Sequence, residues 1–264
     1  MEKQSQHLYQ HYDVSEYTFI DKVQDMIHSV ENTYSFYLTG FLDPRQEVIV
    51  NELVSQTTLT FYSSRDILTE EYHRVIIAPD YYQLNVDDFE ISLLNIHYSK
   101  KFNHLSHSQI MGSLINQLGI KRSVFGDILV NGDEAQIFLE KSMVSYFETN
   151  VSKIAKVPVR LQEVSFDQKI EHLEKGQEQL YLVSSLRLDK VIAAVHKLPR
   201  QTSQKLIQSQ KVKVNHKLTT KATETVLVND LLSVRGYGRC RIISDNGITS
   251  KGKYKLVVKK IRQK

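Results

Sequence analysis

The charges of this chain are divided unevenly along its 264 residues. Residues 181–264 contain 19 of the 34 lysines and arginines but only 4 of the 30 aspartates and glutamates, a net charge of +15. Residues 1–180 carry a net charge of −11, so the +4 of the whole chain conceals a basic module joined to an acidic body. Such a module repels itself unless a polyanion neutralises it, most commonly a nucleic-acid phosphate backbone. We therefore expect separate folded parts, the last of which binds RNA.

The composition narrows the class of protein. An apolar fraction of 41% and a charged fraction of 24% are ordinary for globular proteins, so wholesale disorder is not expected. The single cysteine, Cys240, excludes an internal disulfide and a zinc site built on a cysteine pair. Residues 1–12 lack the apolar core of a secretion signal, and no uninterrupted apolar run approaches the roughly 18–20 residues that span a bilayer. These features indicate a cytoplasmic protein without membrane insertion.

The pattern of apolar residues predicts an α+β protein that begins with a small α/β domain over residues 1–80. Apolar residues recur at three and four positions between Phe19 and Val30, which predicts a helix. Asp43 is expected to cap a second helix, with Pro44 in its first position and Glu47 as the acid of a capping box. Strands are predicted at 34–42, 59–62 and 75–78.

The middle of the chain, residues 81–165, has the order β-α-β-β-α-β, which predicts a ferredoxin-like (RRM-like) domain. Its predicted strands are 89–98, 127–130, 135–139 and 157–164, and its helices run from a capping box at Ser106 to Gly119 and over 141–154. RNA-recognition motifs share this order, but their stacking consensus is missing. Phe138 is therefore expected in the core. Residues 166–180 are predicted to form a short helical connector.

The basic module, residues 181–264, opens with two predicted helices. Residues 186–198 place an apolar stripe beside basic residues, and a second short helix follows Arg200. Arg187, Lys190 and Arg200 are expected on exposed faces, with Asp189 as a salt-bridge partner rather than a catalyst.

A predicted strand over residues 211–217 adds lysines at regular spacing. Same-face residues of a strand lie about 6.6 Å apart, close to the interval between phosphates. Further on, Gly236 and Gly238 let the backbone approach a ligand and present Tyr237 between two arginines. A turn at Asn246–Gly247 is expected to lead into the last strand. We take as candidate RNA-binding residues Arg187, Lys190, Arg200, Lys205, Lys211, Lys213, Asn215, Lys217, Arg235, Tyr237 and Arg239.

The basic module resembles the S-four domain, an RNA-binding domain named after a small-subunit ribosomal protein. The matching pieces are RLDK at 187–190, R-x-x-x-x-K-L-I at 200–207, V-x-V-N at 212–215 and D-x-x-S-V-R-G at 230–236. Gln210 and His216 depart from this pattern because they stand where the family has glycines, and Pro199 replaces a usual serine.

An S-four domain behind an acidic α/β body, with LGIKRSVFGDILV at 118–130 and SVRGYGR at 233–239, is similar to YlmH-type proteins of bacteria. The resemblance implies a C-terminal S-four-like domain and a cytoplasmic RNA-binding protein that acts on ribosomal RNA or tRNA at the ribosome. Related small S-four proteins bind large subunits that carry a stalled nascent chain, which implies a link to translation quality control. YlmH-type proteins are also associated with the cell-division gene cluster.

Two alternatives to non-catalytic RNA binding remain open. S-four domains are often fused to pseudouridine synthases, but only about 75 residues follow RLDK here, and a phosphate loop or dinucleotide fingerprint is missing. The acidic body could instead dock proteins of the cell-division machinery. His104 and His107 have a metal-ligand spacing without a third ligand nearby, so no metal or cofactor is expected.

Overall fold

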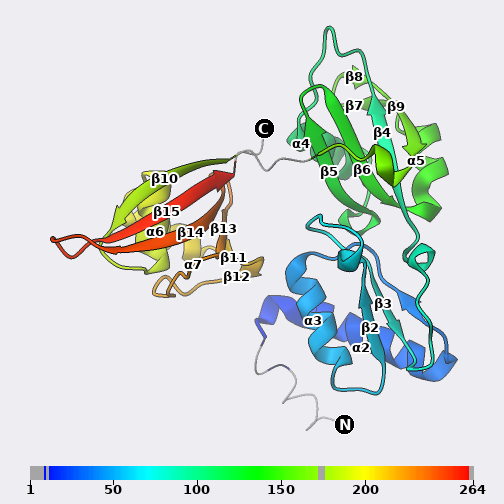
Figure 1. Ribbon diagram of the computed structural model, residues 1–264, viewed down its shortest axis with the longest axis horizontal. Helices are drawn as coiled ribbons and strands as arrows, with labels where there is room; N and C mark the ends of the chain where they lie inside the picture. The colour runs from blue at the N-terminus through cyan, green and yellow to red at the C-terminus, as the bar shows by residue number, and fades with distance from the viewer. Residues whose placement is uncertain (1–8, 10–11, 172–175, 262–264) are drawn as a thin grey trace. The chain divides into compact units, whose positions relative to one another are not determined.

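The computed structural model describes residues 9, 12–171 and 176–261, and the chain forms two compact units, residues 1–173 and 174–263 (Figure 1). Each unit packs helices against antiparallel sheets, which confirms the predicted α+β class. Within the described part of the chain, no helix has both the length and the apolar character needed to cross a membrane.

The first half of unit 1 packs two helices on one face of a three-stranded sheet. The helices are α2 (Tyr17–Thr33) and α3 (Pro44–Val54), and the strands are β1 (Tyr37–Leu38), β2 (Thr60–Ser63) and β3 (Val75–Ala78), in the order β1-β3-β2. Ile20, Val23, Ile27 and Val30 of α2 are all buried because they recur at helical spacing toward the sheet.

Two details of this half differ from the prediction. The strand expected at 34–42 is only Tyr37–Leu38, because Tyr34 ends α2 in a left-handed conformation with φ of 55°. Asp43 caps α3 as predicted, but Gln46 completes the capping box. Glu47 lies one position too far along the helix. It is buried, where it accepts hydrogen bonds from Ser63 Oγ at 2.6 Å and Arg65 Nη2 at 2.9 Å.

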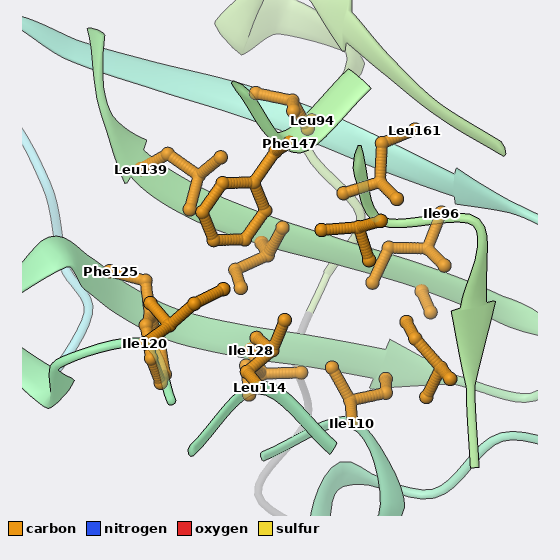
Figure 2. Packing of buried hydrophobic residues seen from close by; sticks show 14 of the residues in the cluster. Leu94, Ile96, Ile110, Leu114, Ile120, Phe125, Ile128, Leu139, Phe147 and Leu161 are labelled. Atoms are coloured by element: carbon orange, nitrogen blue, oxygen red, sulfur yellow. The ribbon is translucent and has the colours of Figure 1, made fainter. Parts of the chain in front are cut away.

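The second half of unit 1 has the predicted ferredoxin-like topology. Strands β4 (Ile91–His97), β5 (Phe125–Asn131), β6 (Glu134–Glu140) and β9 (Arg160–Val164) pair antiparallel in the order β5-β6-β4-β9. Helices α4 (His107–Gly112), which continues as a π-helical turn Ser113–Gln117, and α5 (Val144–Asn150) supply apolar residues to one face. Figure 2 shows that core, in which Ile110 and Leu114 face the strands together with Phe147.

The opposite face of this sheet is also buried. Phe138 is 1% exposed and clusters with Phe41 and Leu68 from the first half of the unit, and Phe166 stacks on its ring at 6.2 Å between centroids. A Cβ atom at Gly126 would lie 2.7 Å from the Phe41 ring, so glycine is required for this close packing. Phe138 is therefore a core residue, as predicted, and cannot stack on a base.

At the end of unit 1, the predicted helix and strand are divided into shorter elements. The helix predicted over 141–154 is a 3-10 turn, Lys141–Met143, followed by α5, and Ile154 lies in the short strand β7 (Lys153–Ile154). The strand predicted at 157–164 is divided into β8 (Val157–Pro158), which pairs with β7, and β9.

Unit 2 is one sheet with two helices on a single face. Its strands are β10 (Gly176–Val183), β11 (Val212–Val214), β12 (Lys217–Leu218), β13 (Leu231–Val234), β14 (Gly238–Ile248) and β15 (Tyr254–Ile261), in the order β10-β15-β14-β13-β11-β12 (Figure 1). The helices are α6 (Leu188–His196) and α7 (Arg200–Gln208). Leu188, Val191, Ile192 and Val195 of α6 and Ile207 of α7 are buried against alternate residues of the strands.

Three predictions for this region are wrong. The helical connector over 166–180 is a single 3-10 turn, Phe166–Gln168, before strand β10, whereas residues 172–175 lie outside the described residues. The strand over 211–217 ends at Val214, and Lys217 belongs to the neighbouring strand β12. Asn246–Gly247 forms a bulge inside β14, and the chain turns after Thr249, whose carbonyl accepts a bond from Gly252 N.

Candidate RNA interface

The centre of the predicted interface is the buried carboxylate of Asp189, in the first turn of α6. Arg187 donates to it through Nε and Nη2 at 3.0 and 3.1 Å. From α7, Arg200 Nε donates at 3.0 Å and Gln204 Nε2 at 2.9 Å. Ser203 Oγ donates to the Asp189 carbonyl at 2.7 Å, which also ties the two helices together. One acid therefore holds two arginines that are separated in sequence.

The electrostatics of Asp189 follow from these contacts. Burial raises the pKa of the carboxyl, but the hydrogen bonds from Arg187, Arg200 and Gln204 outweigh burial and hold the pKa at about 2. The acid is therefore ionised at every physiological pH, and Asp189 is the salt-bridge partner that the sequence predicts. Arg187 and Arg200 keep side-chain exposures of 34% and 52%, so both guanidinium groups still reach solvent.

Three lysines extend this positive surface. Lys190 follows Arg187 by three residues, so it lies on the same side of α6, half-buried. Lys205 and Lys211 are exposed and line a shallow pocket of about 440 Å³ at the end of α7. Leu206 forms part of the pocket wall. A cationic rim around a small apolar wall suits a phosphate next to an unpaired base.

Asn215 and Lys217 have different positions from those predicted. Asn215 and His216 have φ of 49° and 68° and form the two-residue turn of the β11–β12 hairpin. The Asn215 side chain donates to Asp230 Oδ1 at 2.7 Å and accepts from Leu231 N at 2.9 Å, so it fixes the hairpin to β13. Gln210 also has a left-handed backbone, with φ of 56°. Both positions where the family has glycine keep the glycine conformation.

Lys213 and Arg239 lie on the other face of the sheet. Val212 and Val214 pack beneath the helices, so the alternation of a strand directs Lys213 away from them. Lys213 pairs with Ser233, which pairs with Arg239 on the next strand, so these side chains share that second face. Arg241 follows on the same face, and the sequence reasoning missed it although it alternates with Arg239.

Arg235 and Tyr237 occupy the turn between β13 and β14. Arg235 N donates to the Lys211 carbonyl at 2.9 Å, which brings Arg235 beside the pocket. Tyr237 is exposed, and its ring meets His196 edge-on with 5.8 Å between centroids. Burial and the charge of Lys260 lower the pKa of His196 to about 4, so the ring is neutral at pH 7. Tyr237 therefore packs against the last residue of α6 and still remains 45% exposed.

The structure thus places the candidate residues in several parts of unit 2. Arg187, Lys190 and Arg200 lie near Asp189, and Lys205, Lys211 and Arg235 continue from them around the end of α7. Lys213 and Arg239 lie on the opposite face of the sheet, and Tyr237 lies against the end of α6. Asn215 and Lys217 belong to the β11–β12 hairpin, where Lys217 pairs with Val214 and the Asn215 side chain has a structural contact. The sequence reasoning missed Gln204, because only the packing of α7 on α6 brings its amide to Asp189.

Comparison with known proteins is consistent with this organisation. The family model for the RNA-binding domain in YlmH matches residues 85–168, and the model for the S4 domain, the S-four domain predicted above, matches residues 186–232. Ribosome-associated protein quality control protein P2 of Bacillus subtilis (strain 168) is 31% identical over 249 residues, which cover 94% of this chain and 96% of that protein. The structure of cell division protein ylmH from Streptococcus pneumoniae is 42% identical, with a TM-score of 0.55, and covers 62% of this chain and 99% of its own.

The two domain matches fall on the ferredoxin-like half of unit 1 and on the helix pair, strands β11 and β12 and the start of β13 in unit 2. The curated relative extends the similarity over nearly the whole chain. The chain therefore belongs to the YlmH family, with a YlmH RNA-binding domain followed by an S4 domain.

Proposed function

We propose that this protein is a non-catalytic RNA-binding protein that acts on ribosomal RNA or tRNA at the large ribosomal subunit, in translation quality control in the cytoplasm. The observation that carries the proposal is the pair of arginines held by Asp189. The Asp189 carboxylate accepts hydrogen bonds from Nε and Nη2 of Arg187 and from Nε of Arg200. The other guanidinium N–H groups of both arginines are left to donate to phosphate oxygens. A fixed guanidinium loses little entropy when it binds a phosphate.

The charge distribution and the relatives support the same conclusion. A net charge of +15 over residues 181–264 favours a polyanionic partner. The Bacillus subtilis relative is named for association with the ribosome and for quality control, which favours ribosomal RNA or tRNA as that partner. Both matching family models describe binding domains, which favours a role without catalysis.

Co-sedimentation with large ribosomal subunits tests this proposal. The double variant Lys205→Glu/Lys211→Glu changes two exposed lysines of the pocket, so it should fold normally and lose at least tenfold in association. Lys251→Glu/Lys253→Glu makes the same charge change at the exposed β14–β15 turn and should lose much less. Equal losses for both variants, or no loss for either, would contradict the proposed surface.

A second candidate function is an adaptor for cell-division proteins, because the pneumococcal relative is titled a cell division protein. Affinity purification at two salt concentrations separates the candidates. Phosphate contacts release counterions, so bound RNA should be lost steeply as salt rises. An adaptor should retain its protein partner through the same change.

A further inference from the structure

The second face of the β1-β3-β2 sheet is covered by aromatic rings and a 3-10 turn, Val86–Phe89, instead of α-helices. Ile76 and Ala78 of β3 point to this face, and Phe89 packs against them with Leu38, Tyr62 and Tyr82. The Tyr82 ring lies 5.8 Å from Tyr62 and 5.1 Å from Phe36 between centroids. The rings farthest from the sheet reach solvent, since Phe36 is an exposed residue.

The outer layer forms what we call the aromatic patch, namely Tyr34, Phe36, Tyr81 and Tyr82. Tyr34 is 75% exposed, Tyr81 65% and Phe36 39%. Exposed large apolar side chains are normal when they are scattered, but a contiguous group marks an interaction surface. Tyrosine and phenylalanine are also the residues that protein interfaces concentrate.

Hydrogen bonds hold two side chains of the patch, Tyr81 and Tyr82, in place. Tyr81 Oη donates to the Tyr34 carbonyl at 3.0 Å. Tyr82 Oη donates to Asp88 Oδ2 at 2.5 Å, and Asp88 belongs to a capping box with Asn85. A surface that is already ordered loses less conformational entropy when a partner binds.

Tyr34 has an unfavourable backbone conformation, and the packing of its side chain within the chain does not compensate for it. Its φ of 55° lies in the left-handed region, where a residue with a Cβ atom is less stable than glycine. A tyrosine that is 75% exposed recovers little of this by burial within the chain. A binding partner would supply that burial.

The charge around the patch selects the partner. The segments 23–44 and 75–99, which contribute all four patch residues, contain no lysine or arginine. Exposed carboxylates at Glu31, Asp80, Asp87 and Glu90 accompany them. The negative electrostatic potential of these carboxylates repels RNA and attracts cations. An arginine or lysine side chain placed over a tyrosine ring also gains a cation–π interaction.

We infer that the aromatic patch docks a basic segment of another protein, with arginine or lysine side chains against the tyrosine rings and apolar side chains between them. This docking is independent of RNA binding by unit 2. It gives unit 1 a protein-binding role beside the RNA-binding surface around Asp189.

Site-specific photo-crosslinking in the full chain tests the inference. Benzoylphenylalanine at position 81, activated in cells, should crosslink to lysine- and arginine-rich segments of another protein, identified by mass spectrometry. The same group at position 146 is the control, because Tyr146 is an exposed tyrosine of the same unit outside the patch. Crosslinks to RNA, to a second copy of this chain or to acidic segments would overturn the inference, as would no crosslink or the same products from position 146.

Binding of the crosslinked segment, made as a labelled peptide, gives the quantitative test by fluorescence anisotropy. Tyr34→Gly/Tyr81→Ser should weaken it at least tenfold without unfolding the protein, since glycine suits the left-handed backbone at position 34. Phe102→Ser/Tyr146→Ser removes two exposed aromatic residues elsewhere in unit 1 and should leave affinity unchanged. An equal effect of both double variants would contradict docking at the patch. RNA binding should be unchanged in both.

Discussion

Arg200 Nε and Asp189 Oδ2 lie 3.0 Å apart although they come from different helices, with the arginine side chain 52% exposed and the aspartate fully buried. This relationship makes the arginine part of the fold as well as of the proposed RNA-binding surface. Substitutions at Arg200 must therefore be interpreted through Asp189, whereas substitutions at the lysines of the pocket test RNA contact alone.

The first prediction concerns Asp189→Asn, which removes the charge that the two arginines share. We expect a loss of about 1–2 kcal/mol in the free energy of unfolding, less than for a fully buried ion pair because both arginines reach solvent. The folded-state pKa of about 2 is depressed, so the contribution is present at neutral pH and is lost as pH falls from about 4 toward 2. Chemical denaturation at pH 7 and pH 2.5 measures both effects. A deficit that is equal at the two pH values would contradict this assignment.

The second prediction separates Arg200 from Lys205. Arg200→Glu places a second carboxylate beside Asp189, so it should lower the melting temperature and RNA affinity together. Lys205→Glu changes an exposed residue five positions later in α7 and should lower only RNA affinity. Differential scanning fluorimetry and gel shift report the two properties. Equal melting temperatures for the two variants would show that the ion pair between Asp189 and Arg200 does not stabilise the fold.

The third prediction concerns Phe138. Phe138→Ala should destabilise unit 1 by about 3–5 kcal/mol, because it empties a closed core beside Phe41. RNA affinity measured where the variant remains folded should be unchanged. A selective loss of affinity with normal stability would indicate a stacking role.

The fourth prediction concerns pH and Asp127, which accepts backbone hydrogen bonds from Glu71 and Tyr72 at 2.9 and 2.8 Å. Burial raises its pKa to about 6. The folded state therefore binds the proton more tightly than the unfolded state, so the stability contributed by the protonated group is lost as pH rises from about 4 to 6. The asparagine of Asp127→Asn cannot titrate. The unfolding free energy of the variant minus that of the wild type should therefore increase by about 2 kcal/mol as pH rises from about 4 to 6. A difference that is flat with pH would exclude the raised pKa.

The fifth prediction concerns Gln210, an exposed residue with φ of 56° after α7. Gln210→Gly should stabilise the protein by about 0.5–1 kcal/mol, because glycine adopts this conformation without a Cβ penalty. Ser209→Gly provides the matched control, since its φ of −86° offers glycine no such gain. Stabilisation of both, or of neither, would contradict the assigned backbone.

The features that could be predicted from the sequence are those that depend on local periodicity. The stripe of α6, the Asp43 cap and the order of the ferredoxin-like strands follow from residues close in the chain. The alternation in 211–217 was misleading, because period-two alternation does not mark where a strand ends, and Asn215–His216 lacks the usual glycine of a hairpin turn. The bond between Asp189 and Arg200 depends on the packing of two helices, and the aromatic patch joins segments about 45 residues apart, so neither has a local signal.

The dependence of RNA affinity on salt tests the account most directly. For the full chain and a labelled ribosomal RNA hairpin, the logarithm of the association constant should fall linearly with the logarithm of salt concentration. Lys205→Glu/Lys211→Glu should make that slope shallower by about two, one for each phosphate that the variant no longer binds, while Lys251→Glu/Lys253→Glu changes it less. An affinity independent of salt, or one slope shared by the wild type and both variants, would contradict phosphate binding at this surface.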